Sequence, residues 1–211
     1  MEKYRNKQLY LKTKKQYRRR RVFWSLFLII FVFFISLVVN VEAGDSYNSS
    51  FLATQLDTYK KYNFIRELAP VAKEQQEQYG LLSSLTLAQA CLESDFGESL
   101  LSAKYNNLFG MKSYSGIDEV TLNTKEFENG KWITIKGVFK VYPSWSASVK
   151  AHTLLFVNGV DWDPNHYASV LAATNYKEGA QALQEDGYAT DPSYAAKLIK
   201  IIEDYSLSDY D

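Results

Sequence analysis

One carboxyl group stands out as a candidate for acid–base chemistry, that of Glu93 on the last turn of a predicted helix. The apolar stripe that predicts this helix consists of Leu81, Leu85, Ala88 and Leu92. Ser84 is a suitable N-cap, and Gly97 is a suitable stop. Because Glu93 lies beside the stripe and at the negative end of the helix dipole, its ionisation is disfavoured and its pKa is expected to rise. A carboxylic acid that stays protonated near neutral pH can serve as a general acid.

The competing interpretation is an ordinary solvated glutamate at a helix end, since glutamates are common on protein surfaces. Two stretches that accompany Glu93 favour the catalytic interpretation. They are Glu-Ser-Asp-Phe-Gly at 93–97 and Asn-Asn-Leu-Phe-Gly-Met-Lys at 106–112.

A second carboxyl group of interest, that of Glu126, lies on a predicted β-hairpin. Residues 116–141 change from helical to alternating periodicity, and Asn129-Gly130 is a strong signal for a two-residue hairpin turn. With that turn, Glu126 stands opposite Ile133 and shares a face of the sheet with apolar residues. Either the hairpin tip is exposed and Glu126 is solvated, or the carboxylate is functional, and the pattern alone leaves both open.

Composition and charge exclude several classes of function. The 211 residues carry no formal net charge, but residues 1–21 hold ten basic residues and one acidic residue, which leaves 14 basic and 23 acidic residues in the remainder. An acidic body argues against a nucleic-acid partner. The single cysteine, Cys91, excludes an intramolecular disulfide. The two histidines have no clustered ligands, so we expect neither a metal nor a cofactor.

The N-terminal part predicts a membrane anchor. Residues 22–39 form an uncharged apolar run of 18 residues, and roughly 17–25 residues suffice to span a bilayer. The basic flank predicts a cytoplasmic N-terminus and an extracellular body. The predicted organisation is a basic cytoplasmic tail over 1–21, a transmembrane anchor over 22–41, a linker over 42–58 and a folded domain over 59–208. A secretory signal cleaved near Ala43 is the alternative.

Helices flank the predicted hairpin on both sides. They are expected over 64–79, over 145–157, 165–173, 175–185 and 191–205, with a short helix or turn over 99–103. Pro70 predicts a break or kink near Ala69. This order indicates an α+β fold that is mostly α, with a helical lobe and a small β-hairpin lobe. A cleft between two such lobes is a natural ligand site.

Four motifs in order carry a resemblance to a known family. They are Leu-Glu-Ser-Asp-Phe-Gly at 92–97, Asn-Leu-Phe-Gly-Met-Lys at 107–112, Thr-Lys-Glu-Phe at 124–127 and Gly-Tyr-Ala-Thr-Asp-Pro at 187–192. Roughly residues 60–207 resemble the peptidoglycan N-acetylglucosaminidases of glycoside hydrolase family 73, which are lysozyme-like. The resemblance implies that Glu93 is the general acid, Glu126 a second carboxylate and Tyr188 a cleft residue close to the acid. It also implies a set of substrate-binding residues, namely Ser94, Asn107, Phe109, Gly110 and Asp191.

This resemblance, together with the predicted anchor at 22–41, indicates a membrane-anchored endo-β-N-acetylglucosaminidase. Such an enzyme hydrolyses the β-1,4 bond between N-acetylglucosamine and N-acetylmuramic acid in peptidoglycan glycan strands, without a cofactor. Two alternatives stay open. One is a muramidase or lytic transglycosylase of lysozyme-like fold, and the other is a non-catalytic wall-binding protein.

Overall fold

A computed structural model describes the backbone of residues 50–128 and 131–211, and the side chains of these residues except 125–133. By its contacts the chain divides into two units, Met1–Asp57 and Thr58–Asp211. The predicted anchor at 22–41 and its basic flank lie outside the described residues. Among the helices that are described, none combines the length and the apolar character needed to cross a bilayer.

The first described helix covers residues 50–79, so it begins within the stretch expected to be a linker. Of the break or kink expected near Ala69, the break is absent, because the helix continues through Pro70. The proline ring lies on the exposed side, where the carbonyl group of Arg66 that loses its N–H partner can bind water. Buried Leu68 and Ala72 anchor the helix on both sides of the proline.

Helix α2, Ser83–Ser94, lies at the centre of the core. Of its 12 residues only Leu92 and Glu93 are not buried. The expected N-cap at Ser84 is wrong, since the helix begins at Ser83 and the N-cap position holds Leu82 without a side-chain cap. Tertiary contacts satisfy the first amides instead. The N–H of Ser83 donates to Gln76 Oε1 (2.6 Å), and that of Ser84 donates to Asp211 Oδ1 (2.8 Å).

The β-hairpin consists of β1, Glu119–Glu128, and β2, Lys131–Lys140. The two strands are antiparallel, and the expected pairing of Glu126 with Ile133 is confirmed. The predicted turn residues 129–130 lie outside the described residues. The loop that follows α3, Leu100–Tyr105, is tied to β2. The N–H of Ser113 donates to Val138 O (2.9 Å), and that of Lys140 donates to Met111 O (2.9 Å).

The C-terminal half is helical, and its elements are α4 (Trp145–Asn158), α5 (Ala168–Leu171), α6 (Tyr176–Glu185), α7 (Tyr194–Asp204) and a 3₁₀-helix (Leu207–Tyr210). The expected helices over 165–173 and 191–205 are shorter than predicted. Helix α7 starts only after Pro192, because Asp191 accepts a hydrogen bond from the N–H of Ser193 (2.8 Å) in a turn before it.

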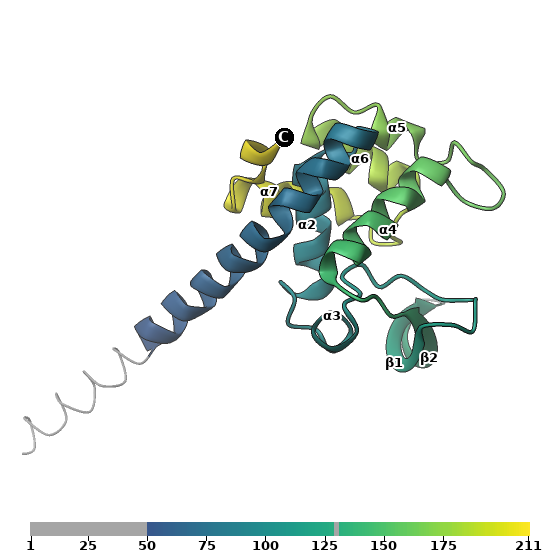
Figure 1. Ribbon diagram of the computed structural model, residues 1–211, viewed down its shortest axis with the longest axis horizontal. Helices are drawn as coiled ribbons and strands as arrows, with labels where there is room; N and C mark the ends of the chain where they lie inside the picture. The colour runs from purple at the N-terminus through teal and green to yellow at the C-terminus, as the bar shows by residue number, and fades with distance from the viewer. Residues whose placement is uncertain (1–49, 129–130) are drawn as a thin grey trace, which may run out of the picture. The chain divides into compact units, whose positions relative to one another are not determined.

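The helices of the C-terminal half complete the core around α2. Helix α2 packs against α6, α7 and the 3₁₀-helix, and Figure 1 shows it among the other helices, with β1 and β2 side by side beyond them. The part of the chain that the structure describes is therefore mostly α with one two-stranded antiparallel sheet, as the order of sequence patterns predicts. Only the last turn of α2, which carries Glu93, is open to solvent.

Candidate active site

A pocket of about 490 Å³ gathers residues from the helical lobe and from the β-hairpin. It is lined by Glu93, Phe109, Gly110, Met111, Lys112, Thr124, Phe139, Leu155, Tyr167, Tyr188, Ala189 and Thr190. Four of the predicted site residues therefore meet here, namely Glu93, Phe109, Gly110 and Tyr188. These four come from three separate segments of the sequence that the core holds together.

Glu93 is the only exposed residue of α2, and its carboxyl group belongs to the pocket wall. Desolvation by the surrounding protein raises its pKa. A hydrogen bond from the Tyr194 hydroxyl to Glu93 Oε1 (2.8 Å) and the charge of Lys197 both lower this pKa, but they do not cancel the rise. The direction agrees with the expectation from sequence, and desolvation is the main cause of the rise. A carboxyl group in this state is suited to proton donation.

Tyr188 lies in an aromatic cluster behind the pocket. Its ring stacks on those of Phe156 (centroids 5.7 Å apart) and Tyr194 (5.8 Å), and it meets the ring of His152 edge-on (6.0 Å). Burial, together with the charge of Glu93, holds the pKa of Tyr188 well above its usual value, so its hydroxyl stays neutral. The cluster fixes the orientation of the ring that the pocket presents.

The loop after α3 supplies Phe109 and Gly110 to the pocket, and Asn107 holds this loop in place. Asn107 is buried and does not line the pocket. Its Nδ2 donates to Met111 O (2.9 Å) and Lys140 O (2.8 Å), while its Oδ1 accepts from the N–H of Met111 (2.9 Å). Its amide therefore links the loop to β2. The ring of Phe109 stacks on the buried ring of His152 at a centroid distance of 3.7 Å.

Two further predicted binding residues, Ser94 and Asp191, do not line the pocket. Ser94 is fully buried, where its hydroxyl donates to Ala90 O (2.6 Å) and accepts from the N–H of Gly97 (2.7 Å). Asp191 forms an ion pair with Lys197 ahead of α7. Hydrogen bonds from Lys197 and from Ser193 lower the pKa of Asp191 to about 2. Both side chains bond to other groups of the protein near a helix end, Ser94 at the end of α2 and Asp191 ahead of α7. They therefore support the local structure and do not face the pocket.

The side chain of Glu126 lies outside the described residues. Its backbone belongs to β1, and Thr124, two positions earlier on the same strand, lines the pocket. The strand that carries the predicted second carboxylate therefore borders the pocket that contains Glu93.

Local sequence patterns do not single out Tyr194, and they include Lys112 only as the last residue of the 107–112 motif. Tyr194 reaches Glu93 across 101 positions of the chain, so no short spacing marks the pair. Lys112 lines the pocket, and its Nζ lies 4.3 Å from the centre of the Phe139 ring. Among the described residues, no three His, Cys, Asp or Glu side chains are placed to hold a metal ion.

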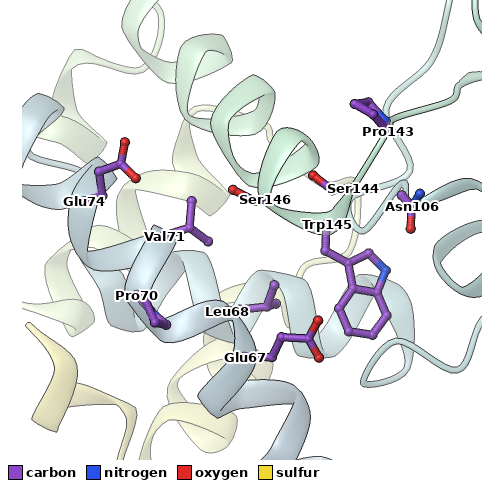
Figure 2. A pocket seen from close by; sticks show the side chains of 10 residues that line it. All are labelled: Glu67, Leu68, Pro70, Val71, Glu74, Asn106, Pro143, Ser144, Trp145 and Ser146. Carbon is purple, nitrogen blue, oxygen red and sulfur yellow. The ribbon is translucent and has the colours of Figure 1, made fainter.

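A second cavity, of about 660 Å³, shares no lining residue with the Glu93 pocket. Figure 2 shows its two carboxyl groups, Glu67 and Glu74, at separate ends of the space between the first described helix and the start of α4. The Glu74 side chain is half-exposed and pairs with Lys150 (2.9 Å). This cavity is larger, but none of the predicted site residues lines it.

Comparison with known proteins gives consistent matches over the helical and hairpin lobes. A family model described as mannosyl-glycoprotein endo-beta-N-acetylglucosaminidase matches residues 69–207. Exo-glucosaminidase LytG of Bacillus subtilis is 41% identical over 94% of this chain and 70% of its own length. A probable N-acetylmuramidase of Lactococcus lactis subsp. cremoris is 39% identical over 74% of this chain, which spans only 36% of that relative.

Solved structures share the fold. The catalytic domain of the autolysin Auto from Listeria monocytogenes superposes with a TM-score of 0.67 at 36% identity, over 72% of this chain and 88% of that one. A C-terminally truncated glycoside hydrolase domain of FlgJ from Salmonella typhimurium has a TM-score of 0.55 at 34% identity, over 69% of this chain and 97% of the other.

Proposed function

Because this chain belongs to the glucosaminidase family of peptidoglycan hydrolases, glycoside hydrolase family 73, we propose that it hydrolyses the β-1,4 bond between N-acetylglucosamine and N-acetylmuramic acid inside glycan strands. The observation that carries this proposal is a pocket that holds one carboxyl group of raised pKa among aromatic side chains. Family membership sets the non-catalytic alternative aside, since the chain is a glycoside hydrolase.

In the proposed mechanism the protonated Glu93 donates its proton to the glycosidic oxygen as the bond to the leaving sugar breaks. The positive charge that develops on the remaining sugar needs a second group, and a water molecule then adds to that sugar and gives up a proton, which completes the hydrolysis. Glu126 on β1 is the proposed candidate, supported by Thr124 on the pocket wall, because alternate positions of a strand lie on one face. The acetamido group of the substrate can act in the same step in its place.

The other pocket residues have proposed roles in binding. Tyr188 and Phe109 present rings against which sugars can pack, and Gly110 leaves the backbone of the loop accessible. Asn107, Ser94 and Asp191 support these positions from outside the pocket, through hydrogen bonds or an ion pair at the ends of the loop and helices. We propose that they act on catalysis through the residues they hold.

The cleaved bond is tested by product analysis of defined peptidoglycan. We expect reduction of the digest with borohydride, followed by mass spectrometry, to give new reducing ends on N-acetylglucosamine. New reducing ends on N-acetylmuramic acid would favour the muramidase alternative, which is the activity named for the Lactococcus relatives. Anhydromuramic ends would indicate a lytic transglycosylase. An early digest containing fragments of intermediate length would support internal cleavage, whereas release of terminal units alone would indicate exo-cleavage, as the name of LytG describes.

We also propose that residues 22–41 anchor the enzyme in the cell membrane with the N-terminus inside. The supporting observation is the apolar run at 22–39 after the arginine-rich flank. Protease added to intact, wall-stripped cells is expected to degrade the domain from about residue 51 onward, and a cytoplasmic marker protein should survive. Recovery of the domain only from the medium, starting near Gly44, would instead show a cleaved signal.

A further inference from the structure

The Glu93 carboxyl group is the end of a short chain of hydrogen bonds inside the helical lobe. The Tyr194 hydroxyl donates to Glu93 Oε1 (2.8 Å), and Gln89 Nε2 donates to the oxygen of that hydroxyl (3.2 Å). Gln89 lies one turn before Glu93 on α2, whereas Tyr194 begins α7. Both are buried, with Gln89 at 0% and Tyr194 at 3% exposure. The chain therefore runs from the core to the pocket.

The chemistry of these groups gives the chain a direction. An amide N–H can only donate, so the oxygen of Tyr194 accepts from Gln89. The single hydroxyl proton of Tyr194 is then available for a hydrogen bond to Glu93 Oε1, which is the acceptor. Burial raises the pKa of Tyr194, so the hydroxyl keeps its proton and remains a donor. Glu93 Oε1 is thereby engaged as an acceptor, and Oε2 is left for a proton.

We propose that Gln89 and Tyr194 are positioning residues that hold Glu93 through Oε1, so that Oε2 carries the proton delivered to the substrate. This inference rests on the proposed role of Glu93 as the general acid. Holding a reacting group in one geometry matters because a displacement of about 1 Å can cost roughly 100-fold in rate.

The packing around Tyr194 makes it a rigid support. Its ring stacks on that of Tyr188 at 5.8 Å between centroids, so one tyrosine lines the pocket while the other holds the acid. Helix α7 also carries Lys197, whose charge acts on Glu93 and which Asp191 holds by an ion pair. The remaining titratable groups of the pocket wall are Lys112 and Tyr167.

Tyr194→Phe keeps the ring and removes only the hydroxyl donor. That donor stabilises the ionised carboxylate, so its loss should raise the pKa of Glu93 further. A general acid works while protonated, so the alkaline limb of the kcat/KM profile should move to higher pH. We expect kcat at the optimum to fall about tenfold from lost positioning, with KM within about twofold.

The pKa of Glu93, measured without substrate, tests the positioning role of Tyr194 separately from the proposed hydrolysis. In protein carrying ¹³C-labelled glutamate, the side-chain carboxyl signal of Glu93 is the one that Glu93→Gln lacks. We expect its titration midpoint to be higher in Tyr194→Phe than in the wild type. The matched control is Tyr176→Phe, which removes another tyrosine–glutamate hydrogen bond, from Tyr176 to Glu203 Oε1 (3.2 Å), outside the pocket. The control should leave the Glu93 midpoint and kcat unchanged.

The outcomes are distinguishable. A midpoint that stays or falls in Tyr194→Phe, while hydrolysis still requires Glu93, overturns the positioning role and leaves the proposed function intact. A higher midpoint in an enzyme whose hydrolysis does not require Glu93 overturns the proposed role of Glu93 as the general acid and, with it, the catalytic role of the Gln89–Tyr194–Glu93 hydrogen bonds. Should Tyr194→Phe fail to fold, Gln89→Met carries the test. It removes only the donor to Tyr194, and we expect a smaller rise of the Glu93 midpoint, whereas an unchanged midpoint overturns the proposal.

Discussion

Glu93→Gln is expected to lower the rate of cell-wall hydrolysis by about 10²–10⁴ while the protein stays folded. Glutamine keeps the size of the side chain, and its carbonyl oxygen can still accept the Tyr194 hydroxyl, but it has no proton to give to a leaving oxygen. The measurement is the clearing of purified cell walls, with kcat corrected for the folded fraction by circular dichroism.

Thermal unfolding provides a second check on this variant. Because the folded protein raises the pKa of Glu93, folding favours the protonated form, and ionisation of Glu93 opposes folding as the pH rises through that pKa. Glu93→Gln cannot ionise, so at alkaline pH it should be at least as stable as the wild type. The matched control, Glu74→Gln in the second cavity, should clear walls normally. Clearing at nearly the wild-type rate by folded Glu93→Gln would remove the assignment of the acid.

Glu126→Gln is expected to reduce activity strongly while the melting temperature changes little. The reason is the proposed need for a second group that stabilises charge on the sugar or activates water, which a neutral amide cannot do equally well. The kcat on defined glycan strands and the melting temperature are measured on the same preparations. A residual rate would correspond to the part of this step that the acetamido group of the substrate supplies.

A matched substitution on the same strand provides the control. Glu119→Gln, at the opposite end of β1, changes a glutamate that is exposed and accepts from the N–H of Gly116 (3.0 Å), outside the pocket lining. It should leave kcat unchanged. If Glu126→Gln instead lowers the melting temperature while the rate per folded molecule holds, then Glu126 has a structural role.

Much of the fold could be predicted because its signals are local. The apolar stripe of α2 and the alternation of β1 and β2 each depend on residues a few positions apart, and the pairing of Glu126 with Ile133 follows from the position of the turn. Errors arose where distant contacts override a local rule. Pro70 does not break its helix, because the buried residues on both sides hold the helix to the core.

Ser84 shows the same limit at a helix start. Local preference favours a serine as N-cap, but Gln76 and Asp211 satisfy the first amides of α2, and the helix begins two residues earlier than an N-cap at Ser84 would place it. Asp211 lies 127 positions away from Ser84 in the chain. No sequence window contains both residues, so only the folded chain reveals the contact.

The sequence by itself determined the fold class, the family and the identity of Glu93 as the candidate acid, because each depends on short motifs and their order. Tertiary structure alone decided which motif residues face the pocket. It placed Phe109, Gly110 and Tyr188 on the wall and turned Ser94 and Asn107 inward as supports. It also brought Tyr194 to Glu93 by packing α7 against α2. The physical reason is that burial and hydrogen bonding depend on which surfaces meet, and residues far apart in the sequence meet only in the folded core.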